Sequence, residues 1–71
     1  MAKNSPEISV VVPLLDEQDN IGLLYEQITK TLTGQHSYEI IFIDDGSTDE
    51  SFAELTKLHK ADNKVRVIRF R

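Results

Sequence analysis

One stretch decides how the rest of the chain is arranged: Tyr38–Glu50, with the sequence YEIIFIDDGSTDE. It begins with an apolar run, Ile40–Ile43, whose β-branched and aromatic side chains are typical of a buried strand. The run ends in two adjacent carboxylates and a glycine, followed by residues that favour the start of a helix. In α/β proteins a ligand usually binds where a buried strand ends and the chain turns into a helix. We therefore treat this point as the first candidate for a functional site.

Length and composition limit the chain to one small domain. It has 71 residues, and a chain of this size buries only about 60% of its unfolded surface. It contains no cysteine, so neither a disulfide nor a thiolate metal site can support its core. The net charge of −4 disfavours a nucleic-acid partner, because proteins that bind the phosphate backbone are usually basic. The sequence has no run long enough to span a membrane and no signal peptide, so we expect a soluble, cytoplasmic chain.

The first part of the chain predicts a strand and then a helix. Ile8–Val12 is nearly continuous in β-branched residues, which predicts a strand buried on both faces. Pro13 has no backbone N–H to donate and should end this strand. Apolar residues recur at helical spacing over Asn20–Thr33, which predicts a helix with one apolar stripe. A short polar side chain at Asp19 or Asn20 would cap its first turn.

The second part of the chain repeats this alternation. Tyr38–Ile43 is the second predicted strand, and a helix is expected from Ser47 to about residue 60. Ser47 and Glu50 have the spacing of a capping box, in which each side chain accepts a hydrogen bond from the backbone N–H of the other residue. Apolar and basic residues alternate over Lys64–Arg71, which predicts a third strand with one more polar face.

The order of these elements predicts the fold. Strands that alternate with helices imply parallel pairing through right-handed crossovers. A β-α-β-α-β chain then has the strand order 3-2-1, which is half of a Rossmann-like parallel sheet in an α/β protein. The polar segment Met1–Pro6 is expected to be a disordered lead-in. Ile8–Val12 would be left as an open apolar edge, so we expect the chain to be a fragment of a longer protein.

The loops after the first two strands meet at one edge of such a sheet, which brings Pro13–Asn20 next to Asp44–Asp49. Both loops carry carboxylates, which accept hydrogen bonds from base N–H groups and ribose hydroxyls or bind a divalent cation. So many acids would repel a bare phosphate, which favours recognition of a nucleoside. The alternative is that these acids only form turns and cap helices. The motifs of dinucleotide-binding proteins, Walker-type NTPases and serine hydrolases are all absent from the sequence.

Two motifs at a characteristic separation carry a resemblance to a known family. They are ISVVVPLLDEQDNI at Ile8–Ile21 and YEIIFIDDGSTD at Tyr38–Asp49. Together they resemble the start of the family 2 glycosyltransferases, which are nucleotide-sugar enzymes of the GT-A fold with the pattern V-V-P-x-Y-N-E, a helix, and V-D-D-G-S-x-D. The resemblance covers about residues 7–71, which would be the N-terminal nucleotide-binding part of a truncated GT-A domain, three-layered when complete. It is closest to the branch that transfers a sugar to a polyprenyl (dolichyl or undecaprenyl) phosphate.

The resemblance implies a nucleotide-binding role for six residues: Pro13, Leu15, Glu17, Ile43, Asp44 and Asp45. The first two would line the base pocket, and Glu17 would help to bind the nucleoside. Asp45 would hydrogen-bond the base, with Ile43 and Asp44 supporting that pocket. Leu15-Asp16 stands where the family pattern has Tyr-Asn, so the aromatic wall for the base is missing.

The resemblance also implies what the chain lacks. The metal-binding Asp-x-Asp of the family, its catalytic base and its acceptor site lie beyond the third strand, so we assign no catalytic and no metal-binding residue here. The full-length enzyme would use a UDP- or GDP-sugar, a divalent cation (Mg²⁺ or Mn²⁺) and a polyprenyl-phosphate acceptor at the cytoplasmic face of a membrane. The 71-residue chain alone would hold no cofactor and would be inactive.

The sequence suggests two alternative classes of protein, of which the second is disfavoured. The chain could be a non-catalytic α/β module that self-associates through the open edge at residues 8–12, giving an antiparallel homodimer with one six-stranded sheet. A receiver-like signalling domain is disfavoured, because it needs acids after the first and third strands. Here the adjacent pair, Asp44-Asp45, follows the second strand.

Overall fold

The computed structural model describes residues 6–34 and 37–70. Its elements follow the order β-α-β-α-β, as predicted: β1 (Ile8–Leu14), α1 (Ile21–Leu32), β2 (Tyr38–Asp44), α2 (Ser51–Ala61) and β3 (Val65–Arg69). The predicted disordered lead-in, Met1–Pro6, lies outside the described residues except for Pro6. No helix among the described residues is both long and apolar enough to cross a membrane.

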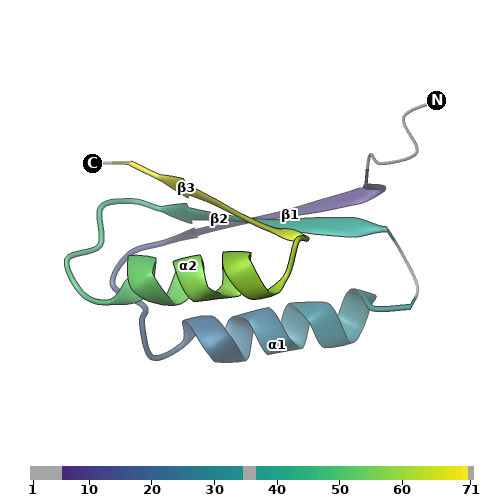
Figure 1. Cartoon of the computed structure of the whole chain (residues 1–71), viewed down its shortest axis with the longest axis horizontal. Coiled ribbons are helices and arrows are strands. Elements are labelled where there is room, and N and C mark those ends of the chain that lie inside the picture. The colour runs from purple at the N-terminus through teal and green to yellow at the C-terminus, as the bar shows by residue number, and fades with distance from the viewer. Residues whose placement is uncertain (1–5, 35–36, 71) are drawn as a thin grey trace.

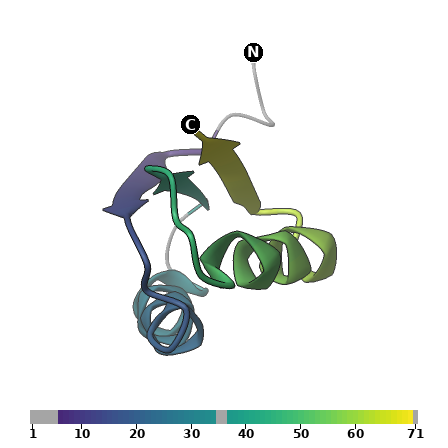
Figure 2. The ribbon, with the colours of Figure 1, turned by 90° about the vertical axis from the view of Figure 1, so that its left-hand side faces the viewer.

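The three strands form one parallel sheet in the order β1-β2-β3, which confirms the predicted α/β fold and the order 3-2-1. The register places Ile8 beside Tyr38 and Leu14 beside Asp44. Both helices lie on the same side of the sheet, as the two views show (Figures 1 and 2). Two consecutive right-handed crossovers in the same direction place their helices on one face, so this arrangement follows from the topology. The other face of the sheet is not covered by any described element.

The strand β1 differs from its prediction in length and in burial. It continues through Pro13 to Leu14, because β1 is an edge strand and a proline there can direct its missing N–H away from the sheet. Exposure alternates along it, and Val11 remains 54% exposed. The prediction of burial on both faces was therefore wrong, because the helices cover only one face of the sheet. The uncovered face presents Val11 and Ile41 as register partners.

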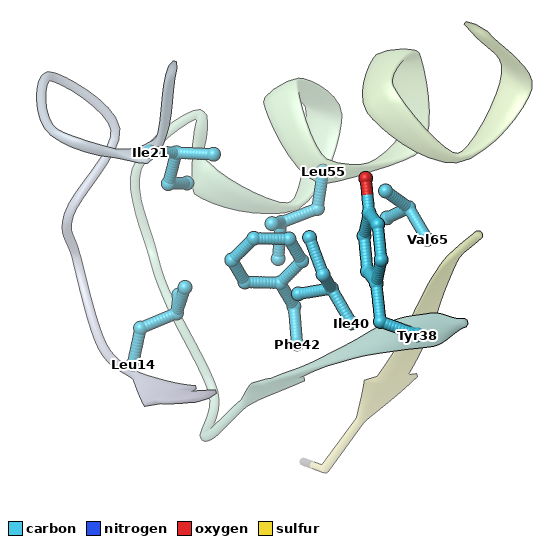
Figure 3. Close-up of a cluster of buried hydrophobic side chains, with 7 residues drawn as sticks. All are labelled: Leu14, Ile21, Tyr38, Ile40, Phe42, Leu55 and Val65. Carbon is cyan, nitrogen blue, oxygen red and sulfur yellow. The ribbon is translucent and has the colours of Figure 1, made fainter. Parts of the chain in front are cut away.

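The core lies between the sheet and the two helices (Figure 3). Its buried side chains are Leu14, Ile21, Tyr38, Ile40, Phe42, Leu55 and Val65. Three of them come from β2, which is the central strand and alternates between buried and half-buried positions. The end of β2 at Asp44 is therefore anchored by the best-packed part of the molecule.

The helix caps differ from the predicted ones. Within the described residues, the N-cap side chains of α1 (Asn20) and α2 (Glu50) make no capping hydrogen bond. Asn20 Nδ2 instead donates to Glu17 Oε1 at 2.8 Å, and the Ile21 N–H donates to the Glu17 carbonyl at 3.2 Å. The Ser47–Glu50 capping box is also wrong, because α2 begins four residues after Ser47, at Ser51. Ser47 Oγ and the Glu50 N–H bind the loop after β1 instead. The N–H of Ser51, the first residue of α2, donates to Asp49 Oδ1 at 2.8 Å.

A tyrosine–carboxylate pair connects the two helices. The Tyr25 hydroxyl on α1 donates to Asp62 Oδ2, just after α2, at 2.6 Å. This hydrogen bond to a carboxylate is the main reason why the pKa of Tyr25 rises to about 12, and burial of the ring adds to the shift. The phenol keeps its proton in the folded state at pH values where an exposed tyrosine, with a pKa of about 10, loses it.

The raised pKa of Tyr25 predicts how stability changes in alkali. The contribution of the hydrogen bond is complete below pH 10 and is lost as the pH rises from about 10 to 12. Because the pair is partly exposed to solvent, we expect the loss to be about 1 kcal/mol or less. Urea unfolding of the wild-type chain and of Tyr25→Phe across this range measures the difference. Parallel losses in the two proteins would show that the Tyr25 hydrogen bond does not stabilise the fold.

Candidate functional site

Two loops meet at the carboxyl edge of the sheet. Loop 1, residues 15–20, follows β1, and loop 2, residues 45–50, follows β2 (Figure 1). The parallel register ends with Leu14 beside Asp44, and the Asp45 N–H donates to the Leu14 carbonyl at 3.0 Å. The sequence prediction that these loops lie side by side is therefore confirmed.

Three consecutive backbone N–H groups of loop 1 donate to side chains in or just after loop 2. These hydrogen bonds are Asp16 N–H to Ser47 Oγ at 2.9 Å, Glu17 N–H to Ser51 Oγ at 2.9 Å and Gln18 N–H to Asp49 Oδ2 at 3.3 Å. Ser51 is fully buried and Ser47 is nearly so, with 6% of its surface exposed. The two serines therefore act as buried acceptors between the loops.

Loop 2 also donates hydrogen bonds to loop 1. Its three consecutive N–H groups donate to side chains of loop 1: Thr48 N–H to Asp16 Oδ1 at 2.8 Å, Asp49 N–H to Asp16 Oδ1 at 3.3 Å and Glu50 N–H to Gln18 Oε1 at 2.8 Å. We call these six hydrogen bonds, each donated by a backbone N–H group, the loop clasp. The N–H groups near a helix start often bind phosphate, but these are already engaged, so this edge does not offer them to an anion.

The carboxylate of Asp49 belongs to the loop clasp and has an altered acidity. The hydrogen bond from the Ser51 side chain contributes most, and the backbone N–H groups of Ser51 and Gln18 add to it, so the pKa of Asp49 is lowered. Hydrogen bonds to the charged form of a carboxylate favour that form. Asp49 is therefore ionised at neutral pH and helps to hold the clasp closed.

The six predicted site residues fall into different positions. Pro13 and Ile43 are register partners at the ends of β1 and β2. Both side chains lie on the uncovered face of the sheet. The next residue of each strand, Leu14 or Asp44, is buried and points toward the helices, and successive side chains of a strand point to opposite faces. Asp45, the residue after β2, is exposed at the same edge. The position of Pro13, Ile43 and Asp45 at one edge agrees with a common pocket. Their role in ligand binding stays a prediction.

A hollow of about 360 Å³ lies along the edge strand and loop 1. Its lining includes Pro13, Leu15 and Glu17 among the predicted residues, together with apolar side chains of β1 and α1. Leu15 is 52% exposed, so it is available to contact a ligand. Ile43, Asp44 and Asp45 do not line this hollow. The structure thus brings the six residues to one edge of the sheet without enclosing them in one cavity.

Asp44 points into the core and not toward solvent. It is fully buried, and its Oδ1 accepts the Ser47 N–H at 2.8 Å. Its Oδ2 has no hydrogen-bond partner among residues 6–34 and 37–70. Asp44 therefore holds the start of loop 2 from beneath, where a ligand at the surface would not touch it.

Sequence reasoning missed three residues that build this edge. Ser47 was assigned to a capping box, Ser51 fell inside the expected helix without a role of its own, and Asp16 was one of the loop acids with no individual role. Asp16 is the only described residue other than glycine with a positive φ, at 50°. A short polar residue in the loop after the first strand was the available signal, since Asp and Asn tolerate this left-handed conformation.

The described residues do not form a metal site. No three of their His, Asp and Glu side chains come together as a set of ligands. Asp44 is buried and Asp45 is exposed, so the adjacent carboxylates face opposite sides and do not converge.

Comparison with known families places the fold and the two motif-bearing loops within a class of glycosyltransferases. Residues 9–71 match the family model described as glycosyl transferase family 2. The chain belongs to this family, which confirms the resemblance seen in the sequence.

The names of curated relatives agree with this family. An uncharacterised glycosyltransferase of Synechocystis is 30% identical over 63 residues, covering 87% of this chain and 20% of the relative. Dodecaprenyl-phosphate galacturonate synthase of Rhizobium johnstonii is 37% identical over 54 residues, 75% of this chain and 16% of the relative. Undecaprenyl-phosphate 4-deoxy-4-formamido-L-arabinose transferase of Klebsiella pneumoniae is 42% identical over 57 residues, 79% of this chain and 17% of the relative. The chain spans about a fifth of the length of these relatives.

Proposed function

We propose that residues 7–71 are the N-terminal nucleotide-binding part of a longer glycosyltransferase and that its loop edge contacts the nucleoside of a nucleotide-sugar donor. The observation that carries this proposal is the loop clasp. It fixes two motif-bearing loops side by side and leaves the exposed acids Glu17 and Asp45 at their edge. Membership of glycosyl transferase family 2 supports the assignment of this edge to a sugar donor.

The chemistry of the edge favours the nucleoside over the diphosphate. Carboxylates accept hydrogen bonds from base N–H groups and ribose hydroxyls. Pro13, Leu15 and Ile43 offer apolar contact to a base, although none of them is aromatic. The six N–H groups of the loop clasp are engaged within the protein, so the diphosphate would be bound by other parts of the enzyme.

We further propose the activity of the longer protein. The names of two relatives support transfer of a sugar to a polyprenyl phosphate, which would place the enzyme at the cytoplasmic face of a membrane. The donor would be a UDP- or GDP-sugar, and a divalent cation (Mg²⁺ or Mn²⁺) would be held by residues outside this chain. The 71 residues alone would bind the nucleotide without transferring the sugar, since they contain about a fifth of the length of the relatives.

Nucleotide titration of the 71-residue chain tests the proposed pocket. We expect UDP or GDP to shift the amide signals of residues 14–17 and 43–45 in ¹H–¹⁵N NMR spectra. Asp45→Asn should weaken binding by about tenfold, because one charged acceptor is lost. Asp19→Asn is the matched control, since it removes an exposed acid of loop 1 outside the predicted pocket. Shifts confined to the other end of the sheet, or none at all, would refute the nucleoside pocket.

A second candidate behaviour is self-association through β1. No charged residue occurs between Ile8 and Leu14, whereas the other edge strand, β3, carries Arg66 and Arg69. Charged side chains on an edge strand discourage pairing with another chain, so β1 is the edge that lacks this protection. Two copies paired about a two-fold axis would form one six-stranded sheet, which is the antiparallel homodimer of the alternative hypothesis from the sequence.

Light scattering at high protein concentration measures this self-association. We expect the mass of a dimer for the wild-type chain and of a monomer for Val11→Lys, which places a charge on β1. Ile68→Lys is the matched control, because Ile68 is a 45% exposed residue of β3 and lies on the opposite edge of the sheet. A monomeric wild-type chain would rule out pairing through β1.

A further inference from the structure

Asp16 makes more contacts between the two loops than any other side chain of loop 1. Its Oδ1 accepts the Thr48 N–H at 2.8 Å and the Asp49 N–H at 3.3 Å. Its own N–H donates to the buried Ser47 Oγ at 2.9 Å. The backbone of Asp16 and its carboxylate therefore bind loop 2 at neighbouring points, which fixes both the distance and the orientation of the two loops.

The backbone of Asp16 is shaped for this contact. Its φ of 50° lies in the left-handed region, which residues other than glycine, Asn and Asp rarely adopt. This conformation turns the chain just after β1, so that the Asp16 N–H and carboxylate both reach loop 2. Alanine would be disfavoured by the backbone and would lack the acceptor, whereas asparagine satisfies both requirements.

We propose that Asp16 is a positioning residue that holds loop 2 against loop 1, so that Glu17 and Asp45 are at the correct separation before a nucleoside diphosphate binds. This inference rests on the proposed function. Glu17 follows Asp16 directly in loop 1, and Asp45 lies at the start of loop 2, so a shift of one loop would separate the two acids. A site that is ordered before binding loses less conformational entropy when the ligand arrives. The role of Asp16 is indirect, since it acts through the N–H groups of loop 2 that its Oδ1 accepts.

Amide hydrogen exchange without ligand tests the ordering role by itself. In Asp16→Ala we expect the Thr48 and Asp49 amides to exchange at least tenfold faster than in the wild-type chain, because they lose their acceptor. In Asp16→Asn the amide oxygen replaces Oδ1, so exchange should stay within about twofold of wild type. Tyr25→Phe is the stability control, because it removes a hydrogen bond that involves no residue of either loop. Its Thr48 and Asp49 amides should remain protected.

Titration of the same variants with UDP and GDP tests the consequence for binding. We expect the affinity of Asp16→Ala to fall by about tenfold, while Asp16→Asn and Tyr25→Phe bind like the wild type. Equal affinity in Asp16→Ala and wild type would overturn the positioning role. If the wild-type chain binds neither nucleotide, the proposed pocket fails. The exchange rates then decide the ordering role alone: equal rates in Asp16→Ala and wild type overturn it, and faster exchange restored by Asn supports it.

Discussion

Replacing Ser51 with alanine is expected to lower the free energy of unfolding by about 2 kcal/mol. Ser51 is fully buried, and its Oγ accepts the Glu17 N–H at 2.9 Å. Alanine leaves this N–H without its acceptor and leaves a small void beside α2. A chain of this length has a stability of roughly 4–10 kcal/mol, so the loss is a large fraction of the total.

Urea unfolding measures this loss, and Ser9→Ala provides a matched control. Ser9 is an exposed serine of β1, whose hydroxyl donates to the Glu39 carboxylate at the surface. Its replacement should change stability by less than about 0.5 kcal/mol, because water replaces an exposed hydrogen bond. The Glu17 amide should also exchange faster in Ser51→Ala. If the two variants unfold at the same urea concentration, Ser51 does not stabilise the loop clasp.

The strands, helices and strand order were predictable because they depend on side chains close together in the sequence. The period of two in β3 and the helical spacing in α1 are local patterns, and β-α-β connections are almost always right-handed. The end of β1 was mispredicted for a non-local reason. Whether a strand continues through Pro13 depends on whether another strand pairs with that edge, and this is decided by the whole sheet.

The position of the site could be predicted from the sequence, but the hydrogen bonds that build it could not. The motifs placed the two loops at one edge of the sheet, and the structure confirms this placement. The capping box failed because Ser47 and Glu50 bind loop 1, which is 31 and 32 residues away in sequence. Local rules compare a side chain only with nearby backbone groups. They do not include a competing hydrogen-bond partner that is distant in sequence and that the fold brings into contact.

Asparagine in place of Asp44 is expected to raise the free energy of unfolding at neutral pH by about 1 kcal/mol, the opposite of the Ser51 effect. The Asp44 carboxylate is fully buried, and its Oδ2 has no partner within the part of the chain that the structure describes. Burying a charged oxygen without a hydrogen bond is costly. Asparagine keeps an Oδ1 for the Ser47 N–H and removes the formal charge, although its buried NH₂ group offsets part of the gain.

Urea unfolding of Asp44→Asn measures the stability, and Asp44→Ala is the matched control, because it also removes the acceptor of the Ser47 N–H and should unfold more easily than wild type. If Asp44→Asn loses as much stability as Asp44→Ala, the second carboxylate oxygen stabilises the fold.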